Sequence, residues 1–355
     1  MAHHSIIFTN AVGNALDTII TDLRPSGVWI LADTNTAQHV VPSLRKQSRQ
    51  LADAPLITIP AGDEAKNIES LSMVWTALSN GHATRKSVLI NVGGGMITDL
   101  GGFAAATFKR GMRFVNVPTT LLGAVDAAIG GKTGINFNGL KNEIGVFREA
   151  DAVVLSACFF PSLPHSELLS GYAEMLKHGL ISDIEMYGRI LDNNVTVTDS
   201  EELLCLLRDN VTVKQRIVAE DPHERGIRRA LNLGHTAGHA FESLALKRGK
   251  PIPHGYAVAW GLVVELILSH LKLKFSSTEL HRVADYVYAN YGVPDITCSD
   301  YNQLLELMTH DKKNDRNGEI NFTLLRNIGD LRIDCIASAD DIKASLDIFR
   351  DLMHI

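Results

Sequence analysis

The stretch LNLGHTAGHA at residues 231–240 places two histidines, His235 and His239, four residues apart among small residues that permit a helix. Side chains at this spacing face the same side of a helix, so both imidazoles could approach one metal ion. The metalloprotease motif HExxH has the same spacing but needs a glutamate directly after the first histidine as general base. Thr236 stands at that position. The protease reaction therefore lacks its base, and the role of each histidine stays open.

Further metal ligands are available in the second half of the chain. A catalytic zinc site has about three protein ligands and an open position, and nitrogen and oxygen ligands suit it. The candidate ligands are Glu174, His235, His239 and His254. Lys177 and His178 follow Glu174 by about one helical turn. Taken singly, each histidine is more commonly a hydrogen-bonded or surface imidazole, and Glu174 is an ordinary partner of Lys177. Their number, beside glycines, favours a metal site.

Two glycine-rich turns indicate where an anion could bind. Gly93–Gly95 lie between a strand pattern and a helix pattern, where backbone N–H groups can approach a phosphate closely. The dinucleotide fingerprint GxGxxG is absent because Thr98 replaces its last glycine, and no P-loop GK[ST] follows. In the second turn Lys132 follows two glycines, and Lys141 and Asn142 come soon after. Either turn alone could serve only packing, but the two together favour an anionic ligand.

The elements that must position these residues follow two patterns. Up to about residue 155, short apolar runs alternate with turns and helical patterns: VWILADT, PLITIPAG, SVLINVGGG, RFVNVPTT and DAVVLS. This alternation is typical of a parallel sheet with crossover helices. We therefore predict a Rossmann-like α/β nucleotide-binding domain at residues 1–158.

The remainder of the chain has a different texture. Helical periodicity dominates in SELLSGYAEMLKHGLI, EELLCLLRDNVTVKQRIVAE, YAVAWGLVVELILSHLKL and ADDIKASLDIFRDLM. A short strand-like run, INFTLL, occurs at 320–325. We predict a mostly α-helical metal- and substrate-binding domain at residues 159–355, with the boundary near FFPSLP at 159–164.

Composition limits the class of protein. A chain of 355 residues with 45% hydrophobic residues is long enough for two cores. The net charge is −6 and basic residues are dispersed, which argues against a nucleic-acid partner or a polybasic membrane patch. The four cysteines lie far apart without a CxxC pair, as expected for a reducing, cytoplasmic location. No signal pattern and no uninterrupted apolar run of about 18 residues is present, so we expect no membrane span.

Seven ordered motifs together resemble 3-dehydroquinate synthase, a family of the sugar-phosphate cyclase superfamily. They are GGGxxxDxxGFxAA at 93–106, RGxRFxxVPTTLL at 110–122, VDxxxGGKTGIN at 125–136, KNxxGxF at 141–147, GxAExxKxG at 171–179, RxxLNxGHTxGHAxE at 228–242 and HGxAVxxG at 254–261. The resemblance runs from about Asp33 to DKKND at 311–315. Any one motif could arise by chance, whereas the set in this order is highly specific.

The resemblance separates the roles of the two histidines of the opening motif. It implies that Glu174, His235 and His254 bind Zn²⁺ or Co²⁺, and that His239 lies in the substrate site near the phosphate. An imidazole off the metal can donate or relay a proton, which agrees with this division. His178 is not a ligand in the family pattern.

The resemblance also implies the reaction. The substrate would be 3-deoxy-D-arabino-heptulosonate 7-phosphate and the products 3-dehydroquinate and phosphate, a carbon–oxygen lyase step of the shikimate pathway to the aromatic amino acids. NAD would oxidise a hydroxyl carbon, which acidifies the neighbouring C–H, and phosphate would then leave by elimination. NADH would return the hydride, and an intramolecular aldol step would close the ring. The cofactor would be regenerated in each turnover.

Both ends of this substrate are anionic, so the resemblance assigns it several cationic partners. Arginine suits a carboxylate, and lysine acts as a point charge on phosphate. The implied substrate residues are Arg110, Asp126, Lys132, Asn142, Lys177, Lys214, Arg228, Asn232, His239 and a lysine of the DKK element, Lys312 with Lys313 as the alternative.

The implied NAD site lies in the first domain. Asp33 would lie near the adenosine end; Gly94, Gly95 and Asp99 near the pyrophosphate and ribose; Thr119, Thr120 and Lys141 toward the nicotinamide. The family usually has GExxK where this chain has Gly-Asp-Glu-Ala-Lys at 62–66, so Asp63 replaces the glutamate before Lys66. The shorter carboxylate puts cofactor affinity in doubt and leaves the chemistry intact.

Three alternatives stay open at this point. A sister cyclase would share the metal and NAD but have no use for a carboxylate grip such as Arg228 with Asn232. A metal-dependent glycerol-phosphate or alcohol dehydrogenase would accumulate NADH. An inactive metal- and nucleotide-binding relative would have lost some of four residues, and all four are present: Lys132, Lys177, Asn232 and His239. The resemblance further implies a homodimer.

Overall fold

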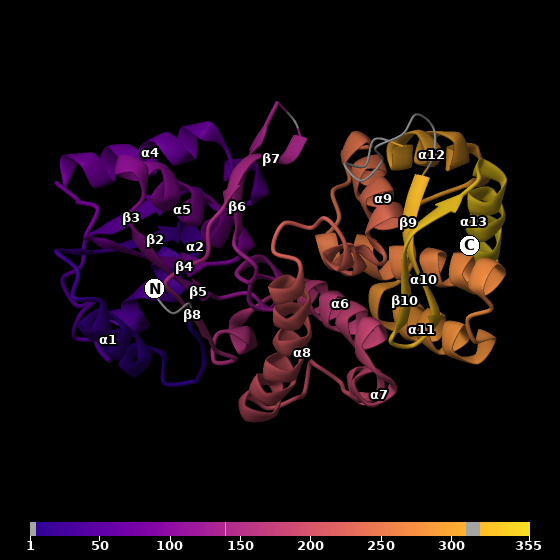
Figure 1. Cartoon of the computed structure of the whole chain (residues 1–355), viewed down its shortest axis with the longest axis horizontal. Helices are drawn as coiled ribbons and strands as arrows, with labels where there is room; N and C mark the ends of the chain where they lie inside the picture. The colour runs from indigo at the N-terminus through magenta and orange to yellow at the C-terminus, as the bar shows by residue number, and fades with distance from the viewer. Residues whose placement is uncertain (1–4, 139, 310–319) are drawn as a thin grey trace. The chain divides into compact units, whose positions relative to one another are not determined.

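The computed structural model describes residues 5–138, 140–309 and 320–355. The chain divides into two compact units. Unit 1 comprises residues 1–164 and 198–211, and unit 2 comprises residues 165–197 and 212–355. Figure 1 labels the helices and strands of both units.

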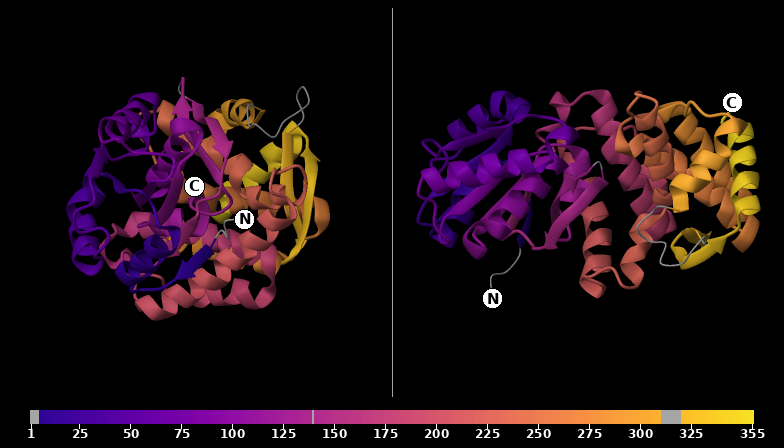
Figure 2. Two further views of the ribbon diagram at one scale, coloured as in Figure 1. Left: turned by 60° about the vertical axis from the view of Figure 1, so that its left-hand side comes forward. Right: turned by 90° about the horizontal axis from the view of Figure 1, so that it is seen from above.

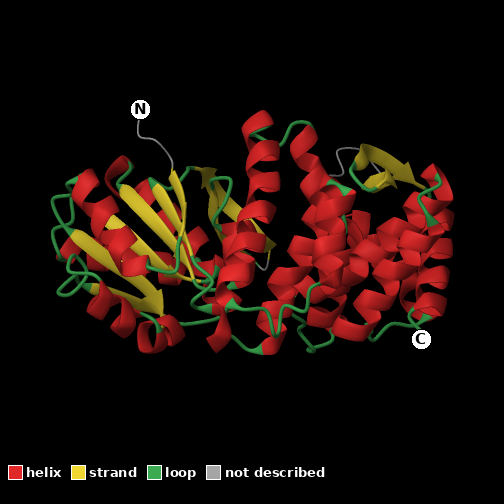
Figure 3. Cartoon of the chain, turned by 90° about the horizontal axis from the view of Figure 1, so that it is seen from below, coloured by secondary structure: helices red, strands yellow, loops and turns green. Residues whose placement is uncertain are grey.

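Unit 1 is built on a six-stranded sheet in the order β1-β8-β5-β4-β2-β3, in which every neighbouring pair is parallel. Figure 3 shows these strands side by side with helices around them. The strands are β1 (Ser5–Phe8), β2 (Val28–Asp33), β3 (Leu56–Ile59), β4 (Val88–Gly93), β5 (Arg113–Pro118) and β8 (Ala152–Leu155). Strand β4 is buried at all of its positions, because helices cover both faces of a parallel sheet. Five of the strands confirm the predicted apolar runs.

The helices of unit 1 cross between these strands. They are α1 (Val12–Leu23), α2 (Thr34–His39), α3 (Val41–Gln47), α4 (Ile68–Asn80) and α5 (Gly95–Thr107). Short turns add η1 (Asp63–Ala65), η2 (Phe108–Arg110), η3 (Gly123–Ala127) and η4 (Phe160–Ser162). Leu16 and Ile20 of α1 belong to one buried cluster with Ile30 and Val92 of the sheet. This packing confirms the predicted Rossmann-like α/β class.

A hairpin in unit 1 departs from the sequence interpretation. The segment interpreted as a glycine turn with following polar residues continues as β6 (Lys132–Phe137) paired antiparallel with β7 (Leu140–Phe147). Gly130 and Gly131 have φ values of 97° and 68°, so the glycine turn itself is present directly before the hairpin. Every described residue of β7 is exposed, which is why its side chains give no buried alternation in the sequence.

Unit 2 is mostly helical, as predicted. Its helices are α6 (His165–Ser182), α7 (Ile184–Asp192), α9 (His235–Lys247), α10 (His254–Leu273), α11 (Ser277–Tyr291), α12 (Tyr301–Thr309) and α13 (Ala339–Leu352), with the short η5 (Ile227–Asn232) and η6 (Cys298–Asp300). Helix α8 (Ser200–Glu220) belongs to unit 2 from residue 212 onward. Strands β9 (Ile320–Asn327) and β10 (Asp330–Ala337) pair antiparallel and run side by side in Figures 1 and 2. The sequence predicted only the first of them.

Helix α10 is the core helix of unit 2. By length and composition it is apolar enough to cross a membrane, with a mean hydropathy of 1.4 over an 18-residue window. However, 72% of that window is buried inside the structure. The sequence of this helix is not an uninterrupted apolar run, because Glu265 lies within it. Helix α10 is extensively buried because it packs against α6, α9, α11 and α13.

Candidate functional site

Three helices of unit 2 bring the predicted metal ligands together. Glu174 lies on α6, His235 begins α9 and His254 begins α10. Glu174 Oε1 lies 3.4 Å from His235 Nε2 and 3.6 Å from His254 Nε2. One carboxylate oxygen therefore faces two imidazole nitrogens from different elements.

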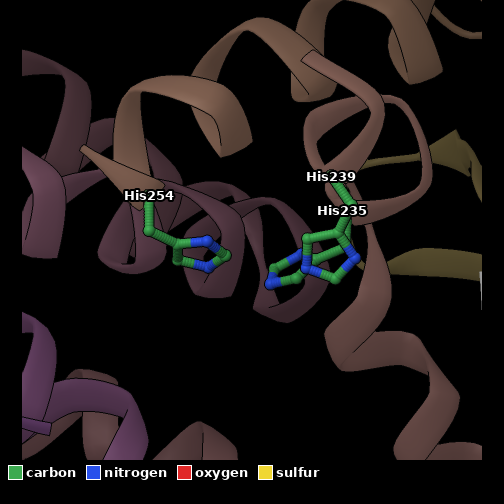
Figure 4. Close-up of side chains that lie close together, drawn as sticks. All are labelled: His235, His239 and His254. Atoms are coloured by element: carbon green, nitrogen blue, oxygen red, sulfur yellow. The ribbon is translucent and has the colours of Figure 1, made fainter. Parts of the chain in front are cut away.

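His239 lies beside the same group. Its ring centroid is 5.3 Å from that of His235 and 5.8 Å from that of His254. Figure 4 shows the three imidazoles directed toward a common space. Each offers a ring nitrogen, and these nitrogens lie within 4.8 Å of one another. The geometry thus permits a second ligand set, formed by the three histidines.

Close helix contacts hold these residues in place. A Cβ added at Gly255, next to His254, would lie 2.0 Å from the Ser170 backbone oxygen of α6. A Cβ at Gly261 would lie 2.0 Å from the Gly234 backbone oxygen, directly before α9. Only glycine permits such an approach of one backbone to another. The glycines of the HGxAVxxG motif thereby set how closely α10 meets the segments that carry Glu174 and His235.

The Glu174 carboxylate is fully buried and has few hydrogen-bond partners. Glu174 is 0% exposed, and it forms an ion pair with Lys177, whose side chain is 1% exposed. Beyond this ion pair, neither Glu174 oxygen accepts a hydrogen bond of regular geometry. Burial alone would raise the pKa of Glu174, but the charge of Lys177, with the contacts to the His235 and His254 imidazoles, holds that pKa well below its usual value. A buried anion with unused acceptor positions is costly unless a cation completes it, so the site fits a divalent metal.

The two imidazoles next to Glu174 are each held at their other nitrogen. His235 Nδ1 lies 3.1 Å from the Leu233 carbonyl oxygen, and His254 Nδ1 lies 3.3 Å from Glu242 Oε2. Burial, with the charge of Lys177, lowers the pKa of His235 to about 4. Burial alone would lower the pKa of His254 as well, but Glu174 and Glu242 raise it to about 10. His235 is therefore neutral at pH 7, the form in which imidazole binds metals.

The other predicted substrate residues of unit 2 lie on α8 and η5. Lys214 and Arg228 are 5% and 2% exposed, although long cations are seldom buried. Arg228 donates to the Pro222 carbonyl at 2.6 Å, and Asn232 donates to Glu224 at 3.2 Å. The predicted Lys312 and its alternative Lys313 lie outside the described residues.

Two glutamates of unit 2, Glu242 and Glu265, have structural roles that the sequence motifs did not predict. Glu265 is 0% exposed and accepts from the backbone N–H groups of Gly234 and Ala237 at 2.6 and 3.2 Å, which fixes the start of α9. In the sequence, Glu265 could have been recognised as the one acidic residue within the apolar stretch of α10. Glu242 closes the motif GHAxE and lies three residues after His239, about one helical turn along the same face.

The predicted cofactor residues of unit 1 gather at one edge of its sheet. Asp33 ends β2, and Gly94 and Thr119 directly follow the carboxyl ends of β4 and β5; these three strands are neighbours in the sheet. The chain runs outward from β2 to β3 and then returns to the other side of β2 with β4. In open α/β sheets, ligands bind at such a switch in strand order, outside the carboxyl ends.

Backbone donors are available at this edge. Gly94 caps the N-terminus of α5, where unpaired N–H groups can bind a phosphate, and Gly95 is its first residue. A Cβ at Gly94 would lie 3.2 Å from Thr120 Oγ1, so the two turns are adjacent. The Asp33 carboxylate accepts from the backbone N–H groups of Asn35 and Thr36, both at 2.9 Å.

The remaining predicted cofactor residues form a polar cluster. Lys66, which is 4% exposed, donates to Asp99 at 2.5 Å and contacts the Asn142 side-chain oxygen. The substituted Asp63 lies 3.3 Å from Lys141. Two residues predicted for NAD, Lys66 and Asp99, thus meet one predicted for substrate. The shorter carboxylate of Asp63 therefore forms an ion pair with Lys141.

The other predicted residues of unit 1 lie on separate short elements. Arg110 ends η2 with a φ of 64° and is exposed, and Lys132 begins β6 and is exposed. Asp126 lies in η3 and is half-buried.

Known proteins resemble this chain along its whole length. Residues 56–170 match the family 3-dehydroquinate synthase N-terminal, and residues 171–314 match 3-dehydroquinate synthase C-terminal. The 3-dehydroquinate synthase of Parabacteroides distasonis is 48% identical over 355 residues, which covers 100% of both chains.

Solved structures agree in fold. A 2-deoxy-scyllo-inosose synthase complexed with carbaglucose-6-phosphate, NAD⁺ and Co²⁺ matches with a TM-score of 0.84 and 21% identity, covering 98% of this chain and 96% of the other. The 2-epi-5-epi-valiolone synthase from Streptomyces hygroscopicus subsp. jinggangensis 5008, with NAD⁺ and Zn²⁺ bound, matches with a TM-score of 0.81 and 24% identity, covering 98% and 97%. These solved structures show the fold, whereas the sequence matches show the family. This chain belongs to the 3-dehydroquinate synthase family.

Proposed function

We propose that this enzyme converts 3-deoxy-D-arabino-heptulosonate 7-phosphate to 3-dehydroquinate and inorganic phosphate, as a carbon–oxygen lyase. The observation that carries the proposal is the meeting of Glu174 Oε1 with His235 Nε2 and His254 Nε2, at 3.4 and 3.6 Å, in a chain of this family. The ring-closing reaction requires acidified C–H and O–H groups, and a divalent cation at this position would increase their acidity.

Glu174, His235 and His254 would hold Zn²⁺ or Co²⁺. When bound, the cation supplies a Lewis acid that lowers the pKa of a substrate hydroxyl and polarises a carbonyl. The two structural relatives are bound to Co²⁺ and Zn²⁺. The unused acceptor positions of the buried Glu174 carboxylate support the assignment. His239, next to both histidines, would stay off the metal.

NAD would bind in the first domain, residues 1–158, and the metal and substrate in the second, residues 159–355. The turns after β2, β4 and β5 would hold the cofactor through Asp33, Gly94, Gly95, Thr119 and Thr120. Asp63, Lys66, Asp99 and Lys141 would bind it from the polar cluster. When bound, NAD supplies a reversible hydride acceptor. Both structural relatives contain NAD⁺.

The chain's own residues would bind and orient the substrate. Arg228 would grip the carboxylate through two parallel hydrogen bonds, with Asn232 beside it. Lysine side chains, namely Lys132, Lys177, Lys214 and Lys312, would neutralise phosphate and acidic oxygens, and Arg110 would add a further cation. Asp126 and Asn142 would bind hydroxyl groups. His239 would hold the proton that moves near the phosphate.

The test is phosphate release by the purified protein with divalent metal and NAD in catalytic amount. We expect inorganic phosphate from the heptulosonate phosphate without net NADH, and none from a hexose phosphate that lacks a carboxylate. Phosphate release that requires stoichiometric NADH formation would favour a dehydrogenase. Release from the hexose phosphate alone would favour a sister cyclase.

We also propose a homodimer. Leu140 and Phe147 of the β6–β7 hairpin are 56% and 53% exposed, and Ile144 lies between them with 39% exposure. A set of apolar side chains on one exposed strand suits a protein interface. Light scattering should give the mass of two chains, and Leu140→Asp with Phe147→Asp should reduce it to one. Val197→Asp, at an isolated apolar residue 79% exposed, should leave the mass unchanged.

A further inference from the structure

A second carboxylate contacts the candidate metal site from outside. Glu242 Oε2 on α9 lies 3.3 Å from His254 Nδ1 on α10. The Glu242 side chain is 13% exposed and that of His254 is 28% exposed, so the contact is partly shielded from water. The other ring nitrogen of His254 faces Glu174 Oε1 at 3.6 Å. The imidazole is therefore held at both of its nitrogens by carboxylates.

This arrangement fixes which nitrogen of His254 can bind a metal. In neutral imidazole one nitrogen carries the proton and the other carries the lone pair, and a hydrogen bond at one decides the state of both. A carboxylate at Nδ1 accepts only, so in the neutral form of His254, the form that binds a metal, the proton lies on Nδ1. The lone pair of that form is then on Nε2, the nitrogen directed at Glu174.

His235 gives an internal comparison. Its Nδ1 donates to the Leu233 carbonyl at 3.1 Å, so its Nε2 also presents a lone pair to Glu174. The two imidazoles are thus held in the same tautomer by different acceptors, a neutral carbonyl and a charged carboxylate. A charged acceptor makes the stronger hydrogen bond and increases the electron density at the ligating nitrogen.

We infer that Glu242 is a positioning residue, which orients His254 and holds its Nε2 ready for the cation bound by Glu174, His235 and His254. The inference rests on the proposed function, since it needs that metal site. An ordinary ion pair would not require the imidazole to meet a second carboxylate at its opposite nitrogen. The loop that joins α9 to α10 spans only residues 248–253, which keeps Glu242 and His254 close.

The test measures metal binding on the full chain, independent of turnover. The dissociation constant for Zn²⁺ is obtained by competition with a chromophoric chelator, and the visible absorption of the Co²⁺-loaded protein reports the coordination geometry. The variants are Glu242→Ala, which removes the acceptor, and Glu242→Gln, which keeps the shape and an acceptor oxygen but loses the charge. Glu306→Ala, at an exposed glutamate on α12, is the matched control.

We expect Glu242→Ala to weaken Zn²⁺ binding by about 10- to 100-fold and to shift the Co²⁺ bands, the usual cost of losing an outer partner of a ligand histidine. Glu242→Gln should fall between that variant and the parent, and Glu306→Ala should match the parent. If Glu242→Ala fails to fold, Glu242→Gln decides the question. Zn²⁺ binding within about twofold of the parent in the folded Glu242 variants, with unchanged Co²⁺ bands, would overturn the inference.

His254→Ala separates this failure from failure of the proposed site. If the parent binds Zn²⁺ and His254→Ala does not, the metal site stands and the Glu242 result judges this inference alone. If His254→Ala binds Zn²⁺ as tightly as the parent, His254 is not a ligand. That result would overturn the metal site and this inference with it.

Discussion

The two units hold their candidate residues by different means. In unit 1 the residues follow the ends of parallel strands or lie on an exposed hairpin, and Asp63 and Lys141 have side chains 53% and 50% exposed. In unit 2 the residues lie on helices, and Glu174 and Lys177 are 0% and 1% exposed. The first region offers backbone donors with side chains that range from buried, such as Lys66, to half exposed, such as Asp63. The second offers buried side chains whose positions depend on helix packing.

This difference predicts how each region responds to change. A partly hydrated polar group can be replaced at small cost, since water substitutes for lost partners. A buried charge that loses its partner has no such substitute. We therefore expect steep effects in unit 2, graded effects in unit 1, and little influence of one set of substitutions on the ligand of the other.

The largest expected effect tests the helical region. His235→Ala should weaken metal binding by more than about 100-fold, since losing a ligand costs more than losing its outer partner. His239→Ala should keep near-normal metal content while activity is lost. Metal content is read by mass spectrometry after dialysis, and NAD titration is the control that unit 1 is intact. Equal metal loss in the two variants would favour the three-histidine set instead.

A graded effect is expected in the polar cluster of unit 1. Lys66→Met removes a buried ammonium that meets Asp99 and Asn142. A hydrogen bond to a charged group contributes about 1.5–3 kcal/mol, which corresponds to about 10- to 100-fold in NAD affinity. Calorimetric titration with NAD measures the change, and metal content should stay that of the parent. Loss of metal together with NAD would show that the two regions are not separable by substitution.

A smaller effect is expected where this chain departs from the usual family pattern. Asp63→Glu restores the longer carboxylate but must displace the 3.3 Å ion pair with Lys141. Both side chains are about half exposed, so the pair contributes at most about 1 kcal/mol. NAD affinity should therefore change by less than about fivefold in either direction. A larger gain would identify the substitution as a real weakening of the cofactor site.

The smallest effect concerns stability in unit 2, away from either site. Ser338 and Asp341 form a capping box at α13, and Asp341 also lies 2.9 Å from Lys272. The Lys272 hydrogen bond, followed by those of Ser338, lowers the pKa of Asp341 to about 2. Asp341→Asn should lower the free energy of unfolding by only about 0.5 kcal/mol at pH 7, since the Lys272 and Asp341 side chains are 31% and 39% exposed.

The pH dependence of that difference has a definite sign. A depressed pKa in the folded state stabilises above the unfolded value and ceases to do so as the pH falls through the folded value. The difference between parent and Asp341→Asn in urea unfolding should be constant from about pH 8 to pH 5 and shrink below about pH 4. A difference that grows on acidification would contradict the assignment.

Much of the candidate site in unit 1 could be predicted, because the ends of the parallel strands determine where its residues lie. Apolar runs ending at Asp33 and near the glycines at 93–95 place those residues at one edge of any parallel sheet. The β6–β7 hairpin was missed because its glycines indicate a turn and its second strand is exposed throughout. Strand β10 was missed although residues 330–335 alternate polar and apolar side chains; its pairing with β9 shifts between Arg332 and Cys335, where Asp334 has a φ of 56°.

In unit 2 the helices were predictable and their crossings were not. Spacing places His235 and His239 on one face but cannot say which of them meets Glu174, since that depends on where α6 passes α9. Glu242 was missed because a glutamate on a helix usually faces water, and only the approach of α10 gives it a partner. The division of roles between the histidines came from resemblance and stays a prediction.

The contacts at Gly255 and Gly261 have a consequence for the choice of cation. Helix α10 can come this close only because a hydrogen atom stands where other residues have a methyl group or more. Zinc bonds to nitrogen and oxygen are about 2.0–2.2 Å long, whereas calcium needs about 2.3–2.6 Å and more ligands. Two positions outside the candidate ligand set, Gly255 and Gly261, therefore govern how closely α10 brings His254 to the other candidate ligands. Comparisons of metal preference among related enzymes should include those positions as well as the ligands.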